Sequence, residues 1–125
     1  MKIKTARIGY QAQADELVLD TTVMTGHGLG AVFAPTWDMV MDSKKNRISW
    51  DEYTRQYTAL MRKRYSGNKQ AFLEVLAQEQ VVLLCYCRDT HDSTQHCHRY
   101  LLRDILTKVG QREGITVEYI GEASR

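Results

Sequence analysis

Proline is nearly absent from this sequence: Pro35 is the only one in 125 residues. The chain also lacks low-complexity segments and internal repeats, so nothing indicates a linker between domains. No apolar run is long enough to cross a bilayer, and no charged and then apolar leader opens the chain. We therefore expect a single domain over residues 1–125, located in the cytoplasm and without a membrane partner.

Charge of one sign is equally scarce. Lysine and arginine number 17, aspartate and glutamate 15, and the formal net charge is +2. This balance is too mild to favour nucleic acid, and the basic clusters at 44–47 and 62–64 are typical of solvated surfaces. We expect no nucleic-acid partner, although a slightly basic surface suits a small anionic ligand.

Cysteine is sparse but concentrated. Three cysteines form a poor disulfide framework, because the count is odd and one residue separates Cys85 from Cys87. Reduced thiols in a reducing compartment are expected instead. All three cysteines, and three of the four histidines, fall between Val81 and Leu102. This crowding of soft and titratable groups predicts that the functional site lies there.

Hydrophobic periodicity predicts alternating strands and helices. Strands are expected at Lys2–Tyr10, Leu17–Met24, Val81–Cys87 and Ile115–Tyr119. Helices are expected at Trp37–Met41 behind the N-cap Thr36, after the capping box Ser49–Glu52, after the cap Asn68, and at Cys97–Val109 closed by Gly110. Glycines 26, 28 and 30 predict a flexible loop.

This order of elements predicts an α/β fold: a single Rossmann-like, three-layer domain with a mainly parallel sheet and helices on both faces. Ligands of such sheets bind beyond the carboxyl ends of the strands. Two segments, 25–36 and 88–96, emerge at that edge. We expect them to meet across one pocket, which the guanidinium of Arg99 shares with the glycine-bearing turn.

The residues at this edge have distinct chemistry. Cys85 and Cys87 lie two apart on a strand and point the same way. Cys97, His98 and Arg99 begin a helix, whose N–H groups and dipole favour an anion and a thiolate at Cys97. The planar fork of Arg99 suits phosphate or carboxylate. The alternative is that the cysteines are structural and that Arg99 ties the helix to the sheet.

Three further residues are candidates for the same pocket. Asp20 could orient a ribose hydroxyl, act as a base or tie the loop backbone. Thr36 could contact a ligand from its helix start. Trp37 would stack on a base if exposed and belong to the core otherwise.

Two other chemistries remain open for the cysteines. Zinc could be bound by Cys85, Cys87 and Cys97 with one of His91, His96 or His98, but the spacing is unlike the usual zinc knuckle, so we expect neither a metal nor a cofactor. Alternatively, Cys97 or Cys87 could be a nucleophile with a neighbouring histidine as base.

Four segments, Phe33–Met41, Ile48–Tyr53, Leu83–Cys87 and Cys97–Leu102, resemble the family known as domain of unknown function 488, in particular its small members from bacteria and phages. The resemblance extends over nearly the whole chain. It implies a compact Rossmann-like fold with the Cys-His-Arg segment beside the cysteine strand, and it matches Asp20 to an acidic residue at the end of an early strand. The link Arg88–His96 is longer than in relatives and is interpreted as a lid, a specificity loop or an ordinary insertion.

The leading hypothesis is a small-molecule binding protein for a nucleotide-like or other phosphate-bearing ligand, and the phage relatives suggest sequestration of a signalling nucleotide. Its predicted ligand-binding residues are Asp20, Thr36, Trp37, Cys85, Cys87, Cys97, His98 and Arg99. The second hypothesis is a thiol- or carboxylate-dependent hydrolase or transferase acting on a nucleotide or nucleoside, with Cys97, Cys87 or Asp20 as the catalytic residue. A zinc-stabilised interaction module is the third. The tyrosine-rich and methionine-rich faces also suggest a homodimer.

Overall fold

A computed structural model describes residues 1–7, 9–23, 28–85 and 97–123. The described elements are β1 (Lys2–Arg7), β2 (Leu17–Asp20), α1 (Gly28–Ala31), α2 (Trp37–Lys44), α3 (Trp50–Gly67), α4 (Lys69–Leu76), β3 (Gln80–Cys85), α5 (His98–Glu113) and β4 (Glu118–Glu122). The four strands form one sheet in the order β2-β3-β1-β4, and every pairing is parallel. The predicted Rossmann-like α/β class with a parallel sheet is confirmed.

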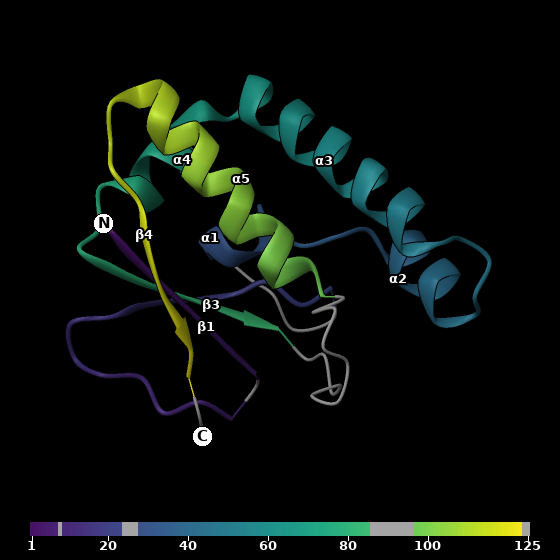
Figure 1. Cartoon of the computed structure of the whole chain (residues 1–125), viewed down its shortest axis with the longest axis horizontal. Coiled ribbons are helices and arrows are strands. Elements are labelled where there is room, and N and C mark those ends of the chain that lie inside the picture. The colour runs from purple at the N-terminus through teal and green to yellow at the C-terminus, as the bar shows by residue number, and fades with distance from the viewer. Residues whose placement is uncertain (8, 24–27, 86–96, 124–125) are drawn as a thin grey trace.

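The helices gather on one face of this sheet (Figure 1). Inward-facing strand residues, including Ile3 and Leu83, pack against the tyrosine stripe of α3 and against Phe72 and Leu102. Within the stripe, Tyr53, Tyr57 and Met61 are buried, as the helical spacing predicts. Strand β3 is buried at five of its six positions because both faces of the sheet are covered, which explains its continuous apolar sequence.

The opposite face is covered differently from our expectation. Ala6, Val82 and Leu84 pack there against Tyr10 and other partly buried residues. Glu16 fixes the 9–16 segment in place, since its carboxylate accepts hydrogen bonds from Lys4 Nζ at 2.8 Å and from the Tyr10 hydroxyl at 2.7 Å. In the described part of the chain, this third layer is therefore a coil segment rather than a helix.

Helix starts follow the sequence closely. Thr36, Ser49 and Asn68 each accept a hydrogen bond from a backbone N–H in the first turn, as predicted. The Ser49 capping box differs in one respect, because the carboxylate of Glu52 pairs with Arg55 and with Gln56. No helix among the described residues combines the length and apolar character needed to cross a membrane.

Some predicted boundaries are wrong. Helix α5 runs through Gly110 to Glu113, and Gly114 closes it with a left-handed φ of 77°. Gly110 is required by packing, since a Cβ there would lie 2.7 Å from the Ile115 carbonyl oxygen. The last strand is accordingly Glu118–Glu122.

The first two strands are shorter than predicted, and a short helix was missed. β1 ends at Arg7 and β2 at Asp20. The glycine-rich segment predicted as a loop contains α1, in which Gly30 packs against the Asp20 backbone so closely that any side chain would overlap it. Close packing, and not only flexibility, explains this glycine.

Candidate functional site

The carboxyl ends of all four strands lie at one edge because the sheet is parallel. Arg7 and Cys85, in register with each other, end the neighbouring strands β1 and β3. The segment after β1 covers one face of the sheet, whereas α5, the next described element after β3, packs on the other. Divergence of neighbouring connections marks the point where open α/β sheets bind ligands. Cys85 lies at this point.

Two thiols meet there. Cys85 ends β3, and Cys97 is the N-cap of α5. Their Sγ atoms lie 2.7 Å apart in a hydrogen bond, without a disulfide. Cys85 is fully buried and Cys97 is 5% exposed. We call Cys85, Cys97, His98, Arg99 and Glu122 the dithiol cluster.

Arg99 holds the dithiol cluster together. Its guanidinium is buried and donates through Nη1 to the Cys85 Sγ at 3.1 Å. Its Nε and Nη2 donate to the two carboxylate oxygens of Glu122 at 3.2 and 2.8 Å, and Nη2 also donates to the Tyr100 hydroxyl at 2.8 Å. The predicted tie between helix and sheet is therefore present, because Arg99 joins α5 to β3 and β4.

Arg99 and Glu122 form a charged pair within the dithiol cluster. Burial alone would lower the pKa of Arg99, but the hydrogen bond to Glu122 and the two cysteines raise it above the ordinary value. Burial alone would raise the pKa of Glu122, whereas the hydrogen bond from Arg99 lowers it. The guanidinium thus stays charged against a sulfur atom, and such a contact favours the thiolate form.

His98 anchors α5 to the turn after β2. Its Nε2 lies 2.9 Å from the Thr21 hydroxyl oxygen and 3.0 Å from the Thr21 carbonyl oxygen. Since the Thr21 hydroxyl donates to the Leu84 carbonyl, Nε2 carries the proton and donates to Thr21. Burial lowers the pKa of His98 and keeps its ring neutral at pH 7. His98 Nε2 is therefore committed to this anchor and does not accept a proton from a thiol.

Asp20, the last residue of β2, precedes the same turn. One of its carboxylate oxygens accepts hydrogen bonds from the backbone N–H of Thr22 at 3.0 Å and from the Thr22 hydroxyl at 2.8 Å. The predicted tie to the loop backbone is therefore present, and a role toward a ribose or as a base stays a prediction. Through Thr21 and His98, this turn and the start of α5 lie side by side. Residues 88–96 and the first part of the glycine-bearing turn lie outside the described residues. A single pocket shared by the two loops stays a prediction.

The cluster also contains a possible set of metal ligands. Ligand atoms of Cys85, Cys97 and His98 all lie within 4.8 Å of one another, and two sulfurs with one nitrogen suit zinc. One feature opposes a cation, because the charge of Arg99 adjoins Cys85. The hydrogen bond from His98 Nε2 to Thr21 is compatible with ligation through Nδ1. The other proposed ligands, Cys87, His91 and His96, lie outside the described residues, so the zinc alternative stays a prediction.

Two predicted ligand-binding residues lie at the start of α2. The Thr36 hydroxyl accepts a hydrogen bond from the Met39 N–H and so caps the helix. Trp37 begins the helix and is 49% exposed, and exposure is what stacking of a base on its ring requires. Contact of either residue with a ligand stays a prediction.

Sequence reasoning missed two members of the site. Glu122 lies 23 positions after Arg99 and was placed beyond the last predicted strand. Had the strand been predicted to start at Glu118, Glu122 would have been placed at the carboxyl edge of the sheet. Thr21, inside a predicted strand, ends up in the turn that receives His98.

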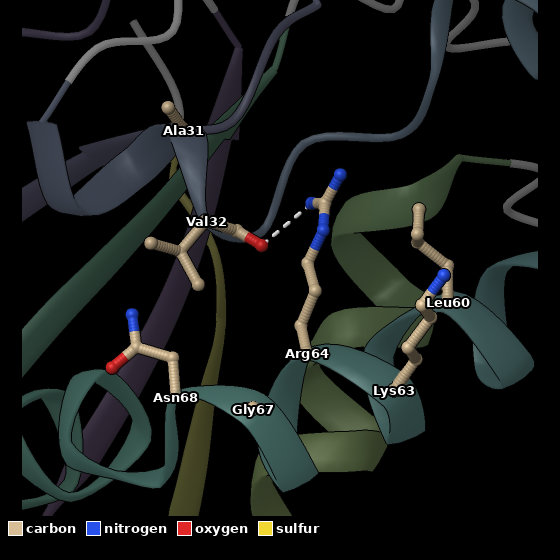
Figure 2. Close-up of a pocket in the computed structure, with 7 residues that line it drawn as sticks. All are labelled: Ala31, Val32, Leu60, Lys63, Arg64, Gly67 and Asn68. Carbon is tan, nitrogen blue, oxygen red and sulfur yellow. Dashed lines mark hydrogen bonds between the residues drawn. The ribbon is translucent and has the colours of Figure 1, made fainter.

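A second region has a different character. Figure 2 shows a hollow lined by Ala31, Val32, Leu60, Lys63, Arg64, Gly67 and Asn68. Arg64, which the sequence places on a solvated basic surface, donates from Nη1 to the Val32 and Ala34 carbonyl oxygens, each at 2.6 Å. This arginine therefore braces the end of α1 against α3.

Comparison with known families identifies the chain. A family model described as the active DUF488-N3 subclade matches residues 29–110. The match is narrower than the nearly complete coverage expected, and it contains Cys85 and Cys97–Arg99 but neither Asp20 nor Glu122. Comparisons with curated proteins and with solved structures found no significant match. Because the matched range covers most of the chain, from α1 into α5, this protein belongs to the DUF488 family.

Proposed function

We propose that the protein is a thiol-dependent enzyme that hydrolyses, or transfers a group from, a small anionic molecule of the nucleotide type. One observation carries this proposal: two sulfur atoms 2.7 Å apart, one of them 3.1 Å from a buried guanidinium, at the ligand-binding edge of a parallel sheet. Cysteines with only a structural role need neither a neighbouring guanidinium nor a position at the ligand-binding edge of the sheet. A reactive thiolate benefits from both.

Cys97 is the better nucleophile of the two. It is the more exposed thiol, and it lies at the start of the 16-residue helix α5, where the helix dipole favours negative charge. In the proposed reaction, its thiolate attacks the electrophilic atom of the substrate and the bond to the leaving group breaks. Water or an acceptor molecule then displaces the sulfur and regenerates the thiolate.

The contacts of Arg99 favour an enzyme over a simple binding protein. Glu122, Tyr100 and Cys85 receive donors from all three nitrogens of its guanidinium. A binding protein that recognised phosphate through Arg99 would need those donors for its ligand. Arg99 is thus better suited to stabilising a thiolate, and ligand binding without chemistry becomes the alternative.

The substrate class and the location follow from more general features. The carboxyl edge between diverging strands is the usual nucleotide position in open α/β sheets. Trp37, exposed on α2, offers a surface on which a base can stack. A thiol nucleophile has to stay reduced, so we place the activity in the cytoplasm.

The test uses reduced protein and a panel of nucleotides, cyclic nucleotides and nucleosides, with products followed by chromatography and mass spectrometry. We expect turnover of at least one compound and a loss of roughly a hundred-fold or more in Cys97→Ser, since removal of a nucleophile disables the reaction. Cys87→Ser is the matched control and should keep activity. Turnover that survives in Cys97→Ser contradicts the proposal.

Labelling and calorimetry separate the alternatives. Iodoacetamide should modify Cys97 with a half-maximal rate below about pH 8.5, the ordinary value for a thiol. Nucleotide binding without turnover, together with ordinary labelling, would instead identify a binding protein. In that case, unchanged binding by Arg99→Ala would also remove the guanidinium from the ligand site.

A further inference from the structure

We propose that the dithiol cluster is a site of reversible oxidation, in which a peroxide converts Cys97 and Cys85 into an intramolecular disulfide. This inference goes beyond the proposed reaction, because it requires only the two thiols and a small oxidant. If the proposed function also holds, the disulfide switches the enzyme off by consuming its nucleophile.

Geometry supports the cross-link. A disulfide holds its sulfurs about 2.05 Å apart, so the 2.7 Å between the two Sγ atoms has to close by roughly 0.7 Å. The cysteines come from different elements, the end of β3 and the start of α5, and are 12 positions apart in sequence. Because the remaining gap is small, we expect adjustment of the two side chains to close it.

Differences between the two thiols assign their roles. Cys97 is 5% exposed, whereas Cys85 is fully buried, so a small oxidant reaches Cys97 first. Cys85 already contacts the Cys97 sulfur and is held by the guanidinium of Arg99. Cys97 is therefore the oxidised thiol and Cys85 the resolving thiol.

The chemistry is balanced with hydrogen peroxide as the oxidant. The Cys97 thiolate attacks one peroxide oxygen, so that an S–O bond forms, the O–O bond breaks, and hydroxide leaves to become water. Cys85 then attacks the Cys97 sulfur, the S–S bond forms, and the S–O bond breaks with release of a second water. The two sulfurs together lose two electrons, which reduce the peroxide, and a small dithiol reverses the process by exchange.

The experiment uses Cys87→Ser protein, in which only Cys85 and Cys97 remain. The reduced protein receives hydrogen peroxide in several-fold molar excess, remaining thiols are alkylated, and tryptic peptides are mapped without reduction. Cleavage after Arg88 separates the Cys85 peptide from the Cys97 peptide. We expect a linked pair of peptides lighter by two hydrogens, which dithiothreitol separates.

Two further proteins complete the test. Cys85→Ser should give no link and should accumulate sulfinic acid at Cys97, because the resolving thiol is missing. Wild-type protein should give the same link as Cys87→Ser. Should Cys85→Ser fail to fold, the comparison between wild type and Cys87→Ser decides by itself.

Two results would overturn the inference. One is Cys97 sulfinic acid without a link in Cys87→Ser, and the other is a wild-type link that disappears when Cys87 is replaced. Because linkage is measured without substrate, it is independent of the proposed function. In an active protein, oxidation should lower turnover at least ten-fold and dithiothreitol should restore it. If the disulfide forms but the protein is inactive both reduced and oxidised, the proposed enzyme activity is rejected and the inferred disulfide is retained.

Discussion

The fully buried Arg99 and the half-buried Arg64 have opposite electrostatic surroundings. Arg99 donates to a carboxylate and a thiol, and these partners raise its pKa although burial alone would lower it. Arg64, at the hollow in Figure 2, donates to two backbone carbonyls, and its burial lowers its pKa. The partners, more than the residue type, therefore distinguish a candidate reactive site from a structural brace.

The largest effect should come from removing the cation of the dithiol cluster, with removal of Arg64 as the comparison. Arg99→Met leaves Glu122 and Cys85 without their donor, so we expect a loss of about 3 kcal/mol in the free energy of unfolding. Arg64→Met leaves only neutral carbonyls unsatisfied and should cost about 1 kcal/mol. Urea unfolding at pH 7 under reducing conditions measures both. Equal losses would show that the two arginines are electrostatically alike, contrary to the comparison.

A glycine between the two regions offers the next test. A methyl group on Gly30 would overlap the backbone of Asp20, so Gly30→Ala should destabilise the protein by about 2 kcal/mol and displace the turn that receives His98. Gly67 lines the hollow, and a Cβ there meets nothing within 4 Å. Gly67→Ala is therefore the matched control. Thermal unfolding and Cys97 labelling should both change in the first variant and neither in the second.

Most of the fold was predictable because its signals are local. The apolar run of β3 and the caps at Thr36, Ser49 and Asn68 depend on residues within one or two turns. Boundaries set by tertiary packing were not. Gly110 has the sequence of a helix end, yet it lies inside α5 because the returning chain at Ile115 presses against it.

The same division holds for the site, where the local features were predictable and the tertiary contacts were not. Crowding of cysteine, histidine and arginine identified its position, and Cys97-His98-Arg99 is a local sequence. The contact between Cys85 and Cys97, and the carboxylate of Glu122 on another strand, depend on how the chain returns to the edge of the sheet. No spacing in the sequence specifies those distances.

The next effect is a pH dependence of the free energy of unfolding, which we attribute to His98 in the dithiol cluster. Burial lowers the pKa of His98 below its ordinary 6.5, so the unfolded chain binds this proton first as the pH falls. His98 therefore contributes its full stability above about pH 6.5 and loses it as the pH drops below that value, with a slope of at most about 1.4 kcal/mol per pH unit. Cys85 and Arg99 also act electrostatically on the ring, and Tyr57 of α3 packs against it.

Urea unfolding between pH 7 and pH 5 measures this slope. His98→Gln, which keeps an N–H donor without a titrating ring, should show a shallower dependence than wild type. Arg64→Met changes only the hollow and should keep the wild-type slope. An unchanged slope in His98→Gln would mean that other groups dominate this pH range.

The smallest effect, on reactivity instead of stability, tests the comparison most directly. Glu122→Gln gives Arg99 the kind of neutral acceptor that Arg64 has, while the contact with the Cys85 sulfur remains. The guanidinium charge then acts on the thiols without a competing carboxylate, so iodoacetamide should label Cys97 roughly three- to ten-fold faster at pH 7. Glu113→Gln, which removes a carboxylate paired with Lys69 at the far end of α5, is the matched control and should leave the rate unchanged. If Glu122→Gln also leaves it unchanged, Arg99 does not govern the thiols, and the cation beside Cys85 becomes a brace like Arg64.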